Sequence, residues 1–505
     1  MSVFKACDIR GAYPTELHEP LYADLGRAVG TLLHERSESP SALVAGDLRL
    51  STPALQAALI EGLVAAGCRV TNLGFVPTPV AYFALRRLRT DGLAIVTASH
   101  NPPGDNGLKL CLGPMPITLE EMARVERTLA SRRFAAGRGT LEALAIEDGY
   151  VAWVCDGAEP GSGLKLVLDC GNGSYSELAP RVLRRLGYDV VELFCTPDGT
   201  FPNRPPDPAV SANLAALRQA VRRSGAAFGV ALDGDGDRVG IVDDAGRSLT
   251  GDQAIILLAR HILSNPFPLP LSSPLPVGEG RVRDAGPACC SDEGPHPSPL
   301  PEGEGAAAEG EGAGAEREKV VCDIKCSKAV LEAVAACGAT PLLERSGHTF
   351  IKARMIAEGA LFGGELSGHF FYRELGGGDD GLYSILRIAE LAKAAPQPLS
   401  VVVDAMPRYA TTPDVRIRYT AQDAPERLEQ IAAAARGEVL RLDGVRVAYP
   451  DGWGLVRCSV TEPLLTFRFE AYAGSPREIA DRFLAPVPDL RGLVLQRLDA
   501  LKGNP

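Results

Sequence analysis

Apolar runs that end in glycine or a polar loop, each followed by a segment with helical spacing, recur along the first 400 or so residues. Leu43-Val-Ala45 leads into Gly46-Asp47, and apolar residues at helical spacing follow from Ala54 to Ala66. The apolar run 92–97 leads into the polar residues Ser99 to Pro102. This alternation predicts α/β units, whose ligands bind at the carboxyl ends of the strands.

The same cycle repeats twice more before the pattern changes. Buried strands are expected at 164–169, 227–232 and 319–323, with helices near 179–186 and 328–336. After Pro398 the segments 401–403, 415–419 and 464–469 alternate like strands around a helix near 424–435. The pattern therefore predicts three similar αβ units followed by a smaller α+β unit. We expect domain bounds of 1–150, 151–250, 251–395 and 396–505.

Periodicity disappears between residues 264 and 318. This segment is a mixture of Pro, Gly, Ala and Glu with two near copies of one octapeptide, Ser273-Pro-Leu-Pro-Val-Gly-Glu-Gly280 and Ser298-Pro-Leu-Pro-Glu-Gly-Glu-Gly305. Such a composition cannot bury enough apolar area to offset the entropy of ordering the chain. It predicts a disordered surface insertion within the third domain, with a partner-binding segment as the alternative.

Composition narrows the class of protein. The 505 residues carry a net charge of −11, with 46% hydrophobic and 23% charged residues, so nucleic acid is a poor partner. No apolar run has the length of a membrane span and the amino terminus lacks the pattern of a signal peptide, which predicts a cytoplasmic protein. The twelve cysteines form no CxxC pair, so we expect reduced thiols rather than a zinc site.

Two polar loops carry most of the chemistry. Asp233-Gly-Asp-Gly-Asp-Arg238 follows a predicted strand and turns three carboxylates toward one point, where their repulsion favours a hard cation such as Mg²⁺. Ser99 lies in Thr97-Ala-Ser-His-Asn-Pro102, with Lys109 downstream. A serine there can carry a phosphoryl group, although alone it could equally cap a helix.

Two further loops have the composition of ligand sites. Gly363-Gly-Glu-Leu-Ser-Gly-His369 offers a carboxylate, a hydroxyl and an imidazole, the set that grips vicinal sugar hydroxyls, and Ser346-Gly-His348 adds a second imidazole. Arg457-Cys-Ser-Val-Thr-Glu-Pro463 offers a guanidinium, hydroxyls and backbone amides, which suits a phosphate dianion. Taken singly, each loop could also be an ordinary polar turn.

Taken together, the chain resembles the α-D-phosphohexomutase superfamily and, within it, the bacterial phosphomannomutase/phosphoglucomutase group. The motifs occur in the family's order: Asp8-Ile-Arg-Gly11, the serine loop 97–102, the aspartate loop 233–238, the sugar loop 364–369 and the phosphate loop 457–463. The resemblance covers nearly the whole chain apart from the insertion. It implies three similar mixed-sheet αβα domains and a smaller C-terminal α+β domain around a central active-site cleft.

The resemblance also implies roles for individual residues. Ser99 would be phosphorylated and would bind Mg²⁺ together with Asp233, Asp235 and Asp237. Phosphoserine would then exchange its phosphoryl group with a hexose 1- or 6-phosphate through a hexose 1,6-bisphosphate, which also activates the enzyme. Around Ser99 the expected catalytic residues are His100, Lys109, Arg238 and His348. The expected substrate-binding residues are Arg10, Lys325, His348, Glu365, Ser367, His369, Arg457, Ser459 and Thr461.

Some questions stay open at this point. The general base is Lys109 or His348, with His369 next, and the oligomeric state is a monomer or a weak oligomer. Cys7 replaces the aromatic residue that the family has before Asp-Ile-Arg-Gly, and Val460 replaces a small polar residue. The alternatives are a phosphoglucosamine mutase, against which Leu366 speaks, and a catalytically disabled sugar-phosphate-binding protein.

Overall fold

A computed structural model describes residues 3–6, 8–265, 317–419, 423–458 and 464–502 of the chain. The predicted insertion, apart from its two ends, lies outside the described residues, as do Cys7, Ser459, Val460 and Thr461. Within the described ranges, no helix combines the length and the apolar character needed to cross a membrane.

The first domain is a mixed sheet with helices on both faces. Four of its six strands are parallel, and buried apolar residues such as Leu43 and Leu93 explain why the central strands are continuous hydrophobic runs in the sequence. The sheet order is β1-β5-β4-β2-β3-β6. Its elements are β1 (Ile9–Ala12), α1 (Glu19–His34), β2 (Ser41–Gly46), α2 (Thr52–Ala65), β3 (Arg69–Phe75), α3 (Thr78–Leu88), β4 (Gly92–Val96), β5 (Asp105–Leu112), α4 (Leu119–Ser131) and β6 (Thr140–Ala143).

The second domain repeats the design with four strands in the order β10-β9-β7-β8, of which β10 is antiparallel to β9. The hairpin between β9 and β10 is the aspartate loop, so the metal-binding candidates lie at the carboxyl end of a buried strand. The elements are α5 (Glu147–Asp156), β7 (Lys165–Asp169), α6 (Leu178–Arg185), β8 (Asp189–Leu193), the 3₁₀ turn η1 (Ser211–Leu214), α7 (Ala215–Ser224), β9 (Phe228–Leu232) and β10 (Val239–Asp243).

The third domain has a five-stranded mixed sheet in the order β12-β11-β13-β14-β15. Its elements are α8 (Gly251–Ser264), β11 (Lys319–Asp323), α9 (Lys328–Ala336), β12 (Thr340–Glu344), α10 (His348–Glu358), β13 (Phe362–Gly364), β14 (Phe370–Tyr372), η2 (Arg373–Leu375), β15 (Gly378–Asp379) and α11 (Gly381–Ala394), followed by α12 (Leu399–Asp404).

One predicted strand is wrong. Residues 401–403 belong to the helix α12, which starts after Pro398 and buries Leu399 and Val403, four residues apart, against the core of the first three domains. Proline suits the start of a helix, and this packing outweighs the strand preference of three consecutive valines.

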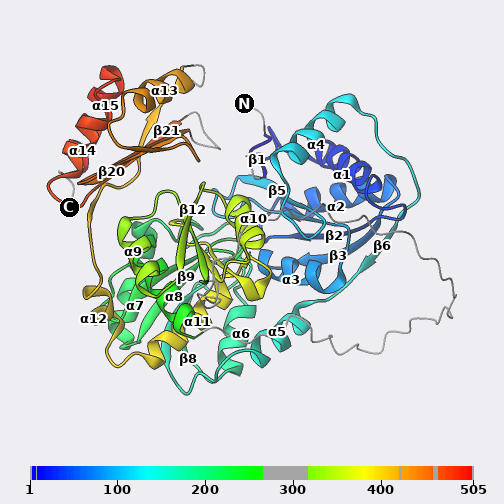
Figure 1. Ribbon diagram of the computed structural model, residues 1–505. Coiled ribbons are helices and arrows are strands. Elements are labelled where there is room, and N and C mark those ends of the chain that lie inside the picture. Colours follow the sequence, from blue (N-terminus) through cyan, green and yellow to red (C-terminus); the bar gives the residue numbers. More distant parts are fainter. Residues whose placement is uncertain (1–2, 7, 266–316, 420–422, 459–463, 503–505) are drawn as a thin grey trace, which may run out of the picture.

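The fourth domain is separate in Figure 1, above α12 and joined to it by one extended segment. Its sheet is antiparallel throughout, with the order β16-β21-β20-β19-β18 and β17 paired to β21. The elements are β16 (Ala410–Thr411), β17 (Val415–Arg418), α13 (Ala424–Ala434), β18 (Glu438–Leu440), β19 (Val445–Tyr449), β20 (Gly452–Cys458), β21 (Leu464–Ala471), α14 (Pro476–Phe483) and α15 (Pro488–Lys502). The predicted fold class is thus confirmed.

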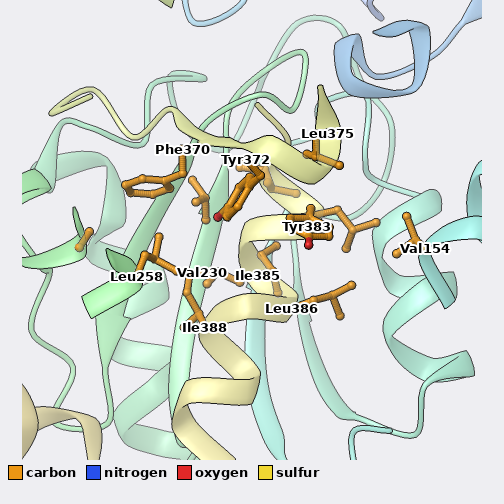
Figure 2. Packing of buried hydrophobic residues seen from close by; sticks show 14 of the residues in the cluster. Val154, Val230, Leu258, Phe370, Tyr372, Leu375, Tyr383, Ile385, Leu386 and Ile388 are labelled. Atoms are coloured by element: carbon orange, nitrogen blue, oxygen red, sulfur yellow. The ribbon is translucent and has the colours of Figure 1, made fainter. Parts of the chain in front are cut away.

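A single hydrophobic cluster runs through the first three domains. Figure 2 shows its part around α11, where Tyr383, Ile385 and Leu386 pack near Val154 and Val230 of the second domain. The fourth domain has its own cluster, which includes Phe467. The first three domains therefore form one packed body that carries the loops of the candidate site.

Candidate active site

Ser99 lies directly after β4 in a tight, buried loop. Its backbone has a φ of +51°, a left-handed conformation that is unusual for serine. The Ser99 hydroxyl donates a hydrogen bond of 2.7 Å to Asp233 Oδ2, and Nδ1 of His100 lies 3.3 Å from Ser99 Oγ. Arg49, fully buried, donates to the carbonyls of Ser99 and Asn101 and so supports the loop from below. The loop therefore holds the Ser99 hydroxyl against the aspartate loop.

The three aspartates of the hairpin between β9 and β10 converge as predicted. Asp233, Asp235 and Asp237 are each 1% exposed, and one oxygen of each lies within 4.8 Å of the others. Burial first, and then the charges of Asp235 and Asp237, raise the pKa of Asp233 well above its usual value. Asp235 Oδ1 and Asp237 Oδ1 are buried with no hydrogen-bond partner among the described residues. Three buried carboxylates with two unpartnered oxygens fit a hard divalent cation.

Lys109 lies on the floor of this cluster. Its ammonium is 2.8 Å from Asp235 Oδ2 and 2.5 Å from Asp237 Oδ2. Burial opposes its charge, but the charges and hydrogen bonds of the two aspartates outweigh burial and raise the pKa of Lys109 above its ordinary value. Lys109 is therefore a fixed cation beside the aspartate loop and a poor proton acceptor.

Two histidines stack over the aspartate loop, with ring centroids 5.7 Å apart. His369 is tied on both nitrogens: Nδ1 lies 2.6 Å from Asp379 Oδ2, and Nε2 accepts a 2.8 Å hydrogen bond from Arg238 Nε. Burial opposes ionisation of Asp379, but the hydrogen bond from His369 Nδ1, helped by the positive charge of Lys109, holds the pKa of Asp379 at about 2. Asp379 and His369 together orient the guanidinium of Arg238.

His348, at the start of α10, lines the cleft. Burial, followed by the positive charge of Lys109, lowers the pKa of His348 to about 4. Its imidazole is neutral near pH 7 and is able to accept a proton.

The loop between β13 and β14 presents Glu365 and Ser367. Glu365 Oε2 and Ser367 Oγ are buried, and neither has a hydrogen-bond partner in the described part of the chain. Buried polar atoms are nearly always paired in folded proteins. Two unpartnered acceptors on one glycine-framed loop therefore indicate a ligand that brings hydroxyl groups.

The opposite wall belongs to the fourth domain. Arg457 on β20 is held by Asp443, whose Oδ2 accepts a 2.7 Å hydrogen bond from Arg457 Nε. Thr466 on β21 pairs with Arg457 on one side and with Arg416 of β17 on the other. The three residues therefore form one row across the sheet, and all three line the cleft. A threonine between two arginines matches a phosphate dianion.

All four domains meet at a cavity of about 750 Å³. Arg10 and His100 come from the first domain, Arg238 from the second, Lys325, His348 and Glu365 from the third, and Arg416 and Arg457 from the fourth. Arg10 donates to Asn101 Oδ1 at 2.7 Å, and Lys325 lies 3.7 Å from Asp323 and 3.6 Å from Asp414. The cavity has cationic groups at both ends and polar acceptors between them.

Comparison with known proteins identifies the family. Models of the four phosphoglucomutase/phosphomannomutase domains match residues 1–136 (alpha/beta/alpha domain I), 148–246 (domain II), 306–409 (domain III) and 411–484 (C-terminal domain). The chain belongs to the phosphoglucomutase/phosphomannomutase family. The predicted membership of the phosphohexomutases, which are isomerases, is therefore confirmed.

Individual relatives agree with this assignment. A phosphomannomutase/phosphoglucomutase of Pseudomonas aeruginosa is 35% identical over 475 residues, which cover 93% of this chain and 92% of the relative. A phosphoglucomutase of Neisseria gonorrhoeae is 32% identical over 494 residues, 96% of each chain. The crystal structure of a phosphoglucomutase/phosphomannomutase family protein from Burkholderia thailandensis aligns with a TM-score of 0.81 at 33% identity, covering 96% of this chain and 98% of that one.

Sequence reasoning missed several residues that support this mutase site. Asp379 fixes His369, Arg49 holds the serine loop, and Thr78 donates a 2.7 Å hydrogen bond to Asp235 Oδ2. Arg416 lies in the row across the sheet with Thr466 and Arg457. Only Asp379 had a visible signal, the polar pair that ends the glycine run 376–378.

Proposed function

We propose that this mutase interconverts the 1- and 6-phosphates of mannose and glucose by way of phosphorylated Ser99 and a bound hexose 1,6-bisphosphate. The observation that carries the proposal is the Ser99 hydroxyl, held 2.7 Å from Asp233 below a cavity with cationic groups at both ends. A hexose with two phosphates needs such a pair of cationic subsites. The names of the relatives favour mannose and glucose phosphates over amino-sugar phosphates.

Asp233, Asp235 and Asp237, together with phosphorylated Ser99, would hold Mg²⁺. The two unpartnered carboxylate oxygens support this ligand set. When bound, the cation neutralises charge on the phosphoryl group that is transferred. Phosphoryl transfer depends mainly on positively charged groups held in place around the phosphoryl group and less on further covalent chemistry by the protein. Lys109, Arg238 and Arg10 supply these cations from three sides of the serine loop.

The sugar loop and the fourth domain would orient the substrate. Glu365 and Ser367 would accept and donate hydrogen bonds with adjacent ring hydroxyls, because their polar atoms lack partners in the described chain. Arg457, Arg416 and Lys325 would bind the phosphate that does not react. Ser459 and Thr461, which follow Arg457 in the sequence and lie outside the described residues, are proposed for the same subsite. Since the phosphates exchange places when the bisphosphate turns over, one such subsite serves both half-reactions.

His348 would accept the proton of the attacking hydroxyl. It is neutral and lines the cleft, whereas both nitrogens of His369 are engaged and Lys109 is held as a cation. The P–O bond to Ser99 breaks as the P–O bond to the sugar forms; Ser99 takes up a proton from solvent, and His348 releases to solvent the proton that it accepted. A His348→Asn variant should then lose kcat with little change in KM, and a comparable loss in His369→Asn alone would reassign the base.

The central test is phosphorylation of Ser99. Wild-type protein incubated with glucose 1,6-bisphosphate should gain the mass of one phosphoryl group and should interconvert mannose 1-phosphate and mannose 6-phosphate. Ser99→Ala should gain no mass and should lose turnover by at least about a thousandfold. Ser367→Ala is the matched control: it should keep the phosphate and lose substrate affinity. Normal turnover in Ser99→Ala would refute the proposal.

A further inference from the structure

Gly236 is the pivot of the aspartate loop. It lies between Asp235 and Asp237 with a φ of +85°, a conformation that glycine adopts without strain. A Cβ at this position would lie 2.3 Å from Cδ2 of Tyr175, so the tyrosine ring is in direct contact with the glycine backbone. On its other side the Gly236 carbonyl accepts a 3.0 Å hydrogen bond from Gly381 N, the first residue of α11. Tyr175 and α11 therefore hold the backbone between two of the three carboxylates.

Tyr175 and α11 are joined by a buried polar cluster of three residues, Tyr150, Tyr175 and Asp380. Tyr150 donates a 2.6 Å hydrogen bond to Asp380 Oδ2, and Tyr175 donates a 2.9 Å hydrogen bond to Asp380 Oδ1. The two phenol oxygens lie 2.8 Å apart. All three side chains are 2% exposed or less.

Asp380 is also the N-cap of α11. Its Oδ1 accepts hydrogen bonds from Leu382 N and Tyr383 N, the donors that open the helix. The residue before it, Asp379, holds His369, and the residue after it, Gly381, holds Gly236. Asp379 and Gly381 thus each hold a different part of the site. Asp380, between them, links both residues to α5 and to the Tyr175 loop.

We propose that Tyr150, Tyr175 and Asp380 are positioning residues for the metal site: they hold Tyr175 and α11 against Gly236, so that Asp235 and Asp237 face one cation. The inference rests on the proposed function, since it assumes that the aspartate loop binds Mg²⁺. Loss of the Tyr150 hydroxyl would leave Asp380 Oδ2 without its partner in a buried place, and loss of the Tyr175 hydroxyl would remove the hydrogen bond that links the ring on Gly236 to the start of α11. Both changes disfavour the present positions of the ring and the helix.

The substitution Tyr175→Phe removes the hydrogen bond to Asp380 and keeps the ring that packs on Gly236. We expect the dissociation constant for Mn²⁺, measured by electron paramagnetic resonance of the free enzyme, to rise about five- to thirtyfold. The Mg²⁺ concentration for half-maximal mutase activity should rise in parallel, while kcat at saturating Mg²⁺ changes less than threefold. Tyr150→Phe, which removes a hydrogen bond from Asp380 without touching the loop, should act in the same direction with a smaller effect.

Tyr383→Phe provides the matched control. Tyr383 belongs to α11 and to the same hydrophobic cluster (Figure 2), and its hydroxyl is buried without a hydrogen-bond partner in the described chain. Removing this hydroxyl should leave the Mn²⁺ dissociation constant unchanged. Calorimetric melting of each variant reports whether the fold is retained.

Two outcomes would overturn the inference. Mn²⁺ affinities of Tyr175→Phe and Tyr150→Phe equal to that of wild type, with lowered melting temperatures, would make the cluster purely structural. Equal weakening in Tyr383→Phe would show a general effect of the substitutions. Failure of the proposed function is recognised separately, because wild-type protein would then bind no Mn²⁺ at the aspartate loop or show no mutase activity that depends on a divalent cation.

Discussion

The two ends of the active-site cavity are built in different ways. Around Ser99 the charged groups are buried, paired and held by several domains at once: Thr78 of the first domain and Lys109 both bind Asp235 of the second. Around Arg457 the groups lie on the strands of one antiparallel sheet in the fourth domain alone: Arg457, paired with Asp443, and Thr466 are largely buried, whereas Arg416 is exposed. The end around Ser99 is preorganised by burial. The other end, formed by Arg416, Arg457 and Thr466 of the fourth domain, is called the binding wall below.

The domains that carry the two ends of the cavity also differ in how extensively they pack against one another. One hydrophobic cluster unites the first three domains, whereas the fourth domain meets them through a small cluster around Ile324 and Trp453 and through polar contacts. These include the ion pair of Arg468 with Asp252 at 2.9 Å and the hydrogen bond from Arg446 to the carbonyl of Ile324 at 2.6 Å. Interfaces of this kind are typical of domains that shift relative to one another. In the proposed function, phosphoryl transfer would occur at the Ser99 end, where the packing is rigid, and entry and turning of the substrate would use the fourth-domain end, where the interface is smaller and more polar.

The largest effect is predicted at the rigid end of the cavity, around Ser99 and the aspartate loop. Removal of divalent cations by chelation should lower the mutase rate by at least about a thousandfold, because the cation neutralises the charge that develops on the transferred phosphoryl group. Added Mg²⁺ should restore the rate. A coupled assay that follows glucose 6-phosphate, with metal analysis of the chelated protein, provides the measurement. Full activity in metal-free protein would contradict the assignment of Asp233, Asp235 and Asp237 as ligands.

The next effect is expected at the binding wall. Arg457→Ala should raise KM for glucose 1-phosphate about ten- to a hundredfold and change kcat less, since in the proposed function the lost guanidinium would contact a phosphate that does not react. Steady-state kinetics separate the two constants. If kcat fell and KM stayed the same, the two ends of the cavity would not differ as proposed.

Features of the fold and of the candidate site that depend on residues close together in the sequence can be predicted from it, whereas features that depend on contacts between distant residues cannot. The strands, the loop chemistry and the convergence of the aspartates follow from local patterns: a buried run, then Asp233-Gly-Asp-Gly-Asp237. The helix at 399–404 was mistaken for a strand because its packing partners lie far away in the chain. Arg49 and Arg416 were missed for the same reason, since each acts across distances that no local spacing encodes, whereas Asp379 had a local signal in the polar pair that follows the glycine run 376–378.

Arg416 gives a smaller test of the binding wall. Because it is exposed and its guanidinium is more screened than that of Arg457, Arg416→Ala should raise KM only about three- to tenfold. Arg418→Ala is the control on the same strand, since Arg418 pairs with Leu464 and stands outside the row of Thr466. Equal effects of the two substitutions would indicate a general attraction of the phosphate and not a specific contact.

The smallest predicted effect concerns His348, whose pKa of about 4 lies below the ordinary 6.5 because of burial and the charge of Lys109. Between these two pH values the unfolded chain binds a proton that the folded protein excludes, so the stability contributed by the neutral imidazole is present above the unfolded pKa and is lost as pH falls toward 4.

His348→Asn removes this linkage. Between about pH 7 and pH 4.5 the variant should lose about 1–2 kcal/mol less stability than wild type, a value reduced from the full linkage because the side chain is only half-buried. Urea unfolding of both proteins at the two pH values measures the difference, in which the contributions of other titrating groups cancel. A histidine resonance of wild type that titrates near pH 6.5 and disappears in His348→Asn would contradict the prediction. Such a resonance would place His348 in a solvated, weakly charged environment. His348, at the start of α10, would then belong with the open fourth-domain end of the cavity and not with the buried end around Ser99.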